Sequence, residues 1–151
     1  MPQNPEAPFP MRCLCATVRR AGRLLTRRYE EALRPAGMTT SQFELMMTLR
    51  FAGASNQSRL AKLMETDQTT LSRNLKLLLQ ERWIETEKDE RDARRRSYRV
   101  TPLGLAVLGE AQRCWQHAHE QMERSLGAPV SALWPMLDRI LQAARSPANS
   151  V

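Results

Sequence analysis

Residues 66–104 read "TDQTTLSRNLKLLLQERWIETEKDERDARRRSYRVTPLG", and this stretch decides the fold. Its first part predicts a helix capped by Thr66 or Asp67. Three leucines share one face of that helix: Leu71, Leu75 and Leu78. The opposite face carries hydroxyl, amide and basic side chains: Thr69, Arg73, Lys76 and Gln80. No acidic residue lies between Asp67 and Glu81, whereas a solvated face normally mixes both signs of charge.

A basic β-hairpin is predicted directly after this helix. "WIETEK" (83–88) alternates as a strand, "DERDARRR" turns, and "SYRV" (97–100) returns. Five arginines lie between Asp89 and Gly104. Thr101-Pro102 then opens a helix, because proline at the first helical position loses no hydrogen bond. A charge run is usually only a solvated face, but a second basic element beside the first indicates a polyanionic partner.

The segment before the helix completes a recognisable unit. "SNQSRLAKLME" (55–65) predicts a short helix with Leu60, Leu63 and Met64 turned inward. Two such helices joined by a few polar residues fit a helix-turn-helix, and a hairpin that follows is a wing. A helix of this kind fits the major groove of DNA. The hairpin can lie along the backbone or enter the minor groove, where arginine is attracted.

The remaining segments predict a mainly α fold with one small β-hairpin. A helix from Met11 ends at "RPAG" (34–37), and Thr39 with Gln42 has the spacing of a capping box for a central second helix. A long fifth helix ends at "GAP" (127–129), and a sixth runs from roughly Val130 to Ala144, with Pro135 distorting its first turns.

Composition narrows the function. The 151 residues are 42% hydrophobic, enough for a core, and the net charge of +7 favours nucleic acid as partner. No apolar run suits a membrane span, and the first residues lack the pattern of a signal peptide, so a cytoplasmic location is expected. No phosphate loop, zinc-protease motif or nucleophile elbow is found, so neither an enzyme nor a cofactor is expected.

Three linked motifs resemble the MarR family of bacterial transcriptional regulators. "LRPAGMTTSQFELMMTL" is similar to its junction of first and second helices, and "SRLAKLMETDQTTLSRNLKLL" to its helix-turn-helix. Asp89-Glu90-Arg91, followed by Thr101, resembles its wing. The similarity covers about residues 11–144. It implies a winged helix-turn-helix homodimer, with the first, fifth and sixth helices interleaved between subunits, over a pseudo-palindromic double-stranded DNA site.

The resemblance also implies roles for individual residues. Arg91 would reach the minor groove and Asp89 would orient it. The residues that would read or flank bases are Thr69, Thr70, Ser72 and Arg73, with Gln68 and Lys76 as helpers. Gln57 and Ser58 would hold a phosphate, and Arg94, Arg95 and Arg96 would grip phosphates without base specificity. Arg82 stands where the family usually has glycine, which predicts a strained backbone or a changed turn.

These inferences give a domain plan and a function. Residues 1–10 form an arm, 11–144 a single domain and 145–151 a tail; within the domain, 11–36 and 101–144 are dimerisation helices and 38–100 the DNA-binding region. The expected function is a homodimeric repressor, released by an aromatic or phenolic acid or by cysteine oxidation. The alternative is a helical dimeric adaptor or anti-regulator that acts through protein contacts without an operator of its own.

The sensing residues have two interpretations each. Tyr29, Met46, Met47 and Trp115 could line an effector pocket or belong to a plain core. The arginine-rich first helix could favour an acidic effector or be a solvated face. Cys13, Cys15 and Cys114 could sense oxidants or be buried apolar residues. Cys114 and His117 share a helical face but His119 does not, so no metal site is expected.

Overall fold

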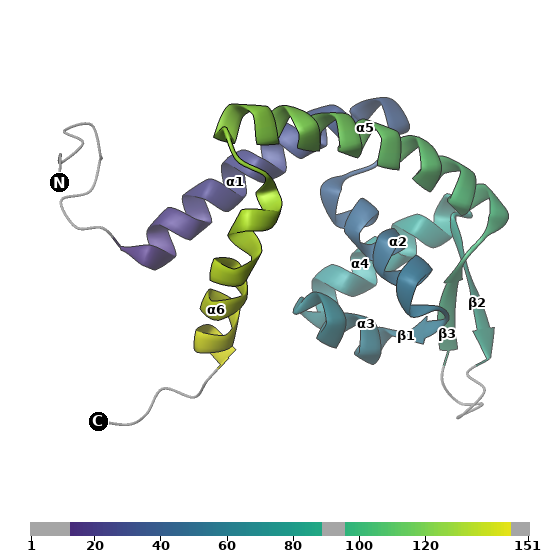
Figure 1. The fold of residues 1–151 in the computed structure, drawn as a ribbon. Helices are drawn as coiled ribbons and strands as arrows, with labels where there is room; N and C mark the ends of the chain where they lie inside the picture. The colour runs from purple at the N-terminus through teal and green to yellow at the C-terminus, as the bar shows by residue number, and fades with distance from the viewer. Residues whose placement is uncertain (1–12, 89–95, 146–151) are drawn as a thin grey trace, which may run out of the picture.

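The computed structural model describes residues 13–88 and 96–145 (Figure 1). Helices dominate, and a three-stranded antiparallel sheet completes the fold. In chain order the elements are α1 (Leu14–Leu33), η1 (Arg34–Ala36), α2 (Thr40–Ala52), β1 (Ser55–Asn56), α3 (Gln57–Met64), α4 (Gln68–Gln80), β2 (Ile84–Lys88), β3 (Arg96–Val100), α5 (Pro102–Leu126), η2 (Val130–Leu133) and α6 (Trp134–Arg145). The arm and most of the tail expected from the sequence lie outside the described residues.

The helices begin where side chains can satisfy their first backbone amides. Thr39 and Gln42 form the expected capping box of α2. Asp67 caps α4, and Thr101 caps α5 with Pro102 in its first turn. These caps confirm the helix starts predicted from the sequence, and they set the direction in which each helix leaves its turn.

Two groups of elements meet along α5. In Figure 1, α2, α3, α4 and the hairpin gather beneath one end of α5, while α1 and α6 lie near its other end. The core joins the first group to α5 and to the end of α1 through apolar side chains. It includes Leu33, Leu45, Met46, Leu49, Leu60, Leu71, Leu75, Leu78, Ile84 and Leu108. The expected inward face of the fourth helix is thus confirmed.

The sheet has the order β1-β3-β2, so β3 lies in the middle. Ile84 pairs with Val100 and Lys88 with Arg96 along the hairpin. On the other edge of β3, Ser55 pairs with Tyr98 and Asn56 with Ser97. The sequence predicts Ser55 and Asn56 as the start of the third helix, and their pairing with β3 corrects that prediction.

Two further expectations need correction. Leu63 was predicted to face inward, but it is 54% exposed, and Met64 is only half-buried. The sixth helix starts at Trp134 and not at Val130, because residues 130–133 form a separate 3-10 turn. Pro135 therefore stands in the first turn of α6, where its missing N–H has no helical partner to lose.

Among residues 13–88 and 96–145, no helix is both long and apolar enough to cross a membrane.

Candidate nucleic-acid interface

The two helices of the helix-turn-helix are held at their amino ends by capping contacts. The Asn56 side chain accepts a hydrogen bond from the Arg59 amide (3.0 Å) at the start of α3. The Gln57 side chain donates to the carbonyl of Gln68, the first residue of α4, at 3.3 Å. Gln57 therefore ties the start of one helix to the start of the other, while Ser58 beside it is exposed.

The outward face of α4 is a polar and basic surface. The α4 residues that are expected to contact DNA are all exposed: Gln68, Thr69, Thr70, Ser72, Arg73 and Lys76. The leucines on the other side of α4 are buried, so the helix can rotate only by exposing them. The helix thus presents hydroxyl, amide and cationic groups outward, the groups that can pair with base edges and phosphates.

Thr70 is less free than the other residues of this face. Its hydroxyl donates to Oδ2 of Asp67 at 2.6 Å, and its amide donates to Oδ1 at 2.8 Å. These hydrogen bonds lower the pKa of the Asp67 carboxyl below its ordinary value. In this structure the Thr70 hydroxyl can accept a hydrogen bond from a base, but its own proton is already engaged.

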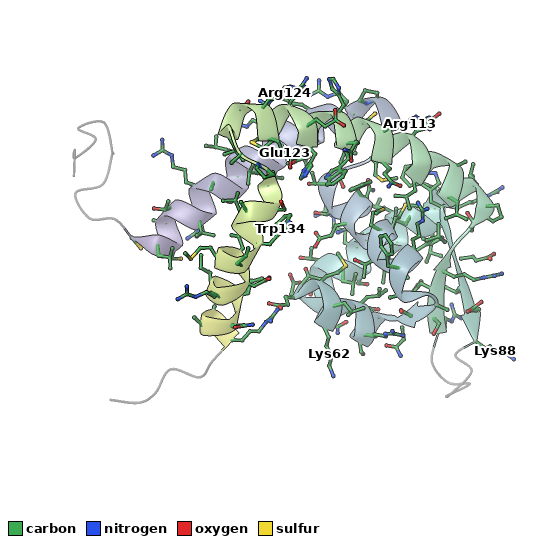
Figure 2. All side chains as sticks on the ribbon, in the orientation of Figure 1. Lys62, Lys88, Arg113, Glu123, Arg124 and Trp134 are labelled. Carbon is green, nitrogen blue, oxygen red and sulfur yellow. The ribbon has the colours of Figure 1, made fainter. Side chains whose placement is uncertain are left out.

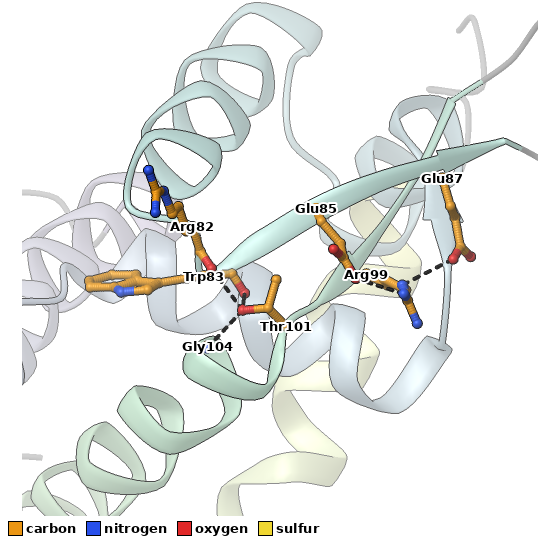
Figure 3. Close-up of polar contacts among 7 residues, drawn as sticks. All are labelled: Arg82, Trp83, Glu85, Glu87, Arg99, Thr101 and Gly104. Carbon is orange, nitrogen blue, oxygen red and sulfur yellow. Dashed lines mark hydrogen bonds and ion pairs between the residues drawn. The ribbon is translucent and has the colours of Figure 1, made fainter.

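The arginines of the hairpin have different surroundings. Arg99 reaches Glu85 at 2.7 Å and Glu87 at 3.1 Å, both on the neighbouring strand (Figure 3). Its charge is therefore balanced within the hairpin. Lys88 and Arg96, by contrast, are cross-strand partners at the described end of the hairpin, and like charges directly opposite each other are destabilising. An anion placed there would relieve that repulsion. Lys88 is not among the residues that the sequence predicts to contact DNA.

Hydrogen bonds of Thr101 join the base of the hairpin to the segment after α4 and to the first turn of α5. The Thr101 hydroxyl lies 2.7 Å from the Arg82 carbonyl and 3.2 Å from the Trp83 carbonyl, and it accepts from the Gly104 amide at 3.0 Å (Figure 3). A Cβ on Gly104 would lie 2.0 Å from the Trp83 carbonyl oxygen, so no other residue fits there without a shift of the backbone. Arg82 has φ +58°, which confirms the strained backbone expected from its side chain in a glycine position.

Four residues expected to contact DNA lie outside the described part of the chain: Asp89, Arg91, Arg94 and Arg95. Arg96 is described, and it is exposed at the start of β3.

Comparison with known proteins agrees with this geometry. A family model described as "MarR family" matches residues 36–95. The chain is 32% identical over 111 residues to the multiple antibiotic resistance protein MarR of Salmonella typhimurium, covering 72% of this chain and 77% of the relative. The chain belongs to the MarR family.

Solved structures of MarR-family regulators share the fold. The Mycobacterium tuberculosis transcriptional regulator MosR in complex with DNA is 29% identical, with a TM-score of 0.75 over 89% of this chain and 99% of that one. A mutant of Escherichia coli MarR complexed with operator DNA, 21% identical, has a TM-score of 0.74 over 88% of this chain and 94% of that one. MarR is a family of transcriptional regulators and not of enzymes.

A groove of about 750 Å³ lies between α1, α2, α3 and α5 of this MarR-family chain. Tyr29, Met47 and Trp115 line it, as the sequence-based pocket hypothesis requires, together with Phe43 and Phe51. Met46 does not line the groove, because its side chain is fully buried in the core on another side of α2. The volume is that of a small-molecule site.

Stacked aromatic rings extend from this groove toward the carboxyl end of α5. Trp115 stacks on His119 with ring centroids 4.7 Å apart, and Tyr29 and Phe43 lie at 6.5 Å and 6.1 Å from Trp115. The Tyr29 hydroxyl lies 3.2 Å from Nδ1 of His119, and burial raises the pKa of the Tyr29 phenol. Glu123 lies 3.8 Å from the other nitrogen of His119 and accepts from the Val130 amide at 2.9 Å.

The cysteines and histidines do not assemble into one cluster. Cys13 and Cys15 are exposed at the start of α1, whereas Cys114 is half-buried. Of the three cysteines, only Cys114 is therefore compatible with the role of a buried apolar residue in the single chain. Among the described residues, no three His, Cys, Asp or Glu side chains are grouped so that they could hold a metal ion. His119 is engaged with Tyr29 and Trp115, and His117 lies 2.8 Å from the Gln121 amide nitrogen.

Large apolar side chains remain exposed on α1, α6 and the turn before α6. They are Leu14, Val18, Leu24, Leu25, Leu133, Trp134, Met136, Leu137 and Leu141. Trp134 opens α6 and is 50% exposed (Figure 2), and no residue of α6 is buried. Large exposed apolar patches are uncommon on monomeric proteins and are typical of a protein contact. Sequence periodicity alone cannot show which apolar side chains a single chain leaves uncovered.

Proposed function

We propose that this protein is a homodimeric, sequence-specific double-stranded DNA-binding regulator that represses transcription and is released from its operator by an effector. The observation that carries the proposal is the outward face of α4. This face is exposed, basic and free of acids, and it lies beside the basic hairpin. A helix with these side chains has the size and the donors needed to read base edges in the major groove.

Each element has a role in this proposal. Thr69, Thr70, Ser72 and Arg73 read or flank bases, with help from Gln68 and Lys76. Ser58, at the exposed amino end of α3, holds a phosphate with Gln57. Arg91, oriented by Asp89, reaches the minor groove. Arg94, Arg95 and Arg96 contact phosphates, and Lys88 joins them because it is the strand partner of Arg96.

The homodimer rests on the uncovered apolar faces of α1 and α6. A two-fold axis brings identical faces together, so one patch can cover its copy in the second subunit. A dimer places two copies of α4 about one turn of DNA apart, roughly 34–36 Å, over a pseudo-palindromic operator. An effector in the groove below α5 acts through its different affinity for DNA-competent and DNA-incompetent spacings of the two α4 helices.

Oxidation of a cysteine is the second route of release that we propose. Cys13 and Cys15 are exposed on α1, an element of the proposed dimer interface. Peroxide is expected to release DNA from the native protein but not from a Cys13→Ser/Cys15→Ser variant. Equal release from both proteins would eliminate these two cysteines as the sensor.

Selection of bound duplexes from a random DNA pool tests the central proposal. A recovered palindrome with half-sites one helical turn apart, bound by the dimer in a gel shift, is the expected result. Failure to enrich any sequence, with a dimer that still forms, would favour the adaptor that acts through protein contacts. Arg91→Ala should weaken binding to the selected site and reduce its salt dependence; unchanged affinity would remove the minor-groove role of Arg91.

A further inference from the structure

The groove between α1, α2, α3 and α5 carries one kind of charge. Its described lining consists of apolar and aromatic side chains, four hydroxyl groups and one charged residue, Glu44. The arginines of α1 (Arg19, Arg20, Arg23, Arg27 and Arg28) are exposed, and none of them lines the groove. The arginine-rich helix therefore gives no support to an acidic effector at this site.

The Glu44 carboxylate has no cationic partner in the described part of the chain. The ion pairs there involve other acids. Glu30 on α1 accepts a hydrogen bond from the hydroxyl of the groove residue Thr40. Neighbouring groups partly remove water from the Glu44 carboxyl and so raise its pKa, although the residue is exposed at the rim. A ligand cation beside it would stabilise the charged carboxylate.

Aromatic side chains provide the rest of the recognition surface. Tyr29, Phe43, Phe51 and Trp115 come from three helices and line the same groove. The faces of aromatic rings carry partial negative charge and attract cations, most strongly where water is partly excluded. The same rings provide apolar contact for the hydrophobic part of a ligand.

We propose that this groove binds hydrophobic organic cations, with Glu44 as the counter-ion and the aromatic side chains as the walls. The proposal names the ligand class of the effector site and rests on the proposed function only for the consequence of binding, the release of DNA. An aromatic carboxylate would place its charge near Glu44 and would be repelled. The groove is large enough for a ligand with several rings.

A pair of isosteric ions tests the charge preference directly. Calorimetric titration of the full-length protein, without DNA, with tetraphenylphosphonium and with tetraphenylborate compares the same shape with opposite charges. The cation is expected to bind more tightly than the anion. Glu44→Gln, which keeps the shape of the side chain, is expected to weaken cation binding by about fivefold and to strengthen anion binding.

Two further variants fix the location and the specificity of the effect. Glu110→Gln, on α5 outside the groove, changes the net charge equally and should leave both affinities unchanged. Phe51→Ala removes an exposed groove side chain and should weaken both ions together. Tighter binding of tetraphenylborate or benzoate to the native groove, or equal effects of Glu44→Gln and Glu110→Gln on the cation, would overturn the proposal.

The two proposals fail separately. If the cation binds with the expected charge dependence but no operator is found, the function fails and the ligand class stands. If the operator is bound but the cation does not bind, the ligand class fails and the function stands. Release of the selected operator by tetraphenylphosphonium, lost in Glu44→Gln, would join the two.

Discussion

The α4 and hairpin region and the α1/α6 region of this chain differ in how well a single polypeptide covers their apolar side chains. In α4 and the hairpin, the apolar side chains Leu71, Leu75, Leu78 and Ile84 are buried, and most of the polar side chains are exposed. In α6 no residue is buried, and its apolar side chains face solvent. The first region therefore presents a mainly polar surface to a hydrophilic partner. The second region needs a partner chain to bury its apolar side chains.

This difference means that the homodimer should affect operator affinity but not the fold of the DNA-binding unit. The fold of the α4 and hairpin unit depends on contacts within one chain, so a disrupted dimer should leave it folded. The affinity for a two-fold operator depends on joining two such units, because the second half-site binds at a high effective concentration. Variants in the two regions should therefore change different measurements.

The largest effect is expected from breaking the apolar face of α6. Leu137→Asp places a charge on a surface that we propose becomes buried in the dimer, and an unpaired buried charge is costly. We expect monomers in sedimentation experiments, native-like circular dichroism, and a loss of operator affinity of about 100-fold or more in gel shifts. Phe51→Asp makes the same kind of change on an exposed residue of α2, outside the proposed interface, and should remain dimeric. A Leu137→Asp protein that is still dimeric would refute the α6 interface.

The next effect concerns the exposed face of α4. Arg73→Ala is expected to reduce the preference for the operator over random DNA by roughly 1–3 kcal/mol, since a bidentate base contact contributes about this much. Dimerisation should be unchanged. Arg113→Ala removes the same charge from α5, on the side of the molecule away from the hairpin end at Lys88 (Figure 2), and should change neither quantity. An equal loss of specific and random binding in Arg73→Ala would make it a phosphate contact.

A smaller effect is expected from a substitution in the hairpin, which should raise the stability of the fold but weaken the contact with DNA. Arg96→Ala removes a like-charge repulsion with Lys88 and should slightly raise the stability to urea. It should also lower the slope of log affinity against log salt by about 0.9 for one lost phosphate contact. An unchanged salt slope would exclude Arg96 as a phosphate contact, whatever happens to stability.

The smallest effect is a pH dependence of the fold itself. The hydrogen bonds from Thr70 lower the pKa of Asp67 from its ordinary value of 3.8. Because the folded-state pKa is the lower one, this carboxylate stabilises the fold above its ordinary pKa, and the contribution is lost as the pH falls through the folded-state pKa. Urea midpoints of Asp67→Asn should therefore fall less steeply in acid than those of the native protein.

Most of the fold could be predicted because local signals agree with the tertiary structure. Thr39, Asp67 and Thr101 cap helices with their own side chains, and a capping residue acts within one turn of the chain. The leucine spacing of α4 likewise specified its buried face. The reading face followed from the same periodicity, since the residues opposite a buried stripe must be exposed.

The remaining features depend on contacts between distant segments. β1 consists of two residues and exists only because β3 lies beside it, so no periodicity could reveal it. Leu63 looked like a core residue, yet it lines the open groove. The charge of that groove could not be read from the arginines of α1, because only the packing of α1 on α2 determines which side chains enter it. Glu44 was missed for the same reason.

The central position of β3 has a mechanical consequence for the proposed complex. A free two-stranded hairpin is marginal in water and bends easily, but β3 is bonded on one edge to β2 and on the other to the strand that leads into α3. The base of the wing and the start of α3 are therefore parts of one rigid frame. A duplex that meets this frame must adjust its own groove width and curvature to fit. Stiff and flexible base steps would then be distinguished by their cost of deformation, even at positions that no side chain touches.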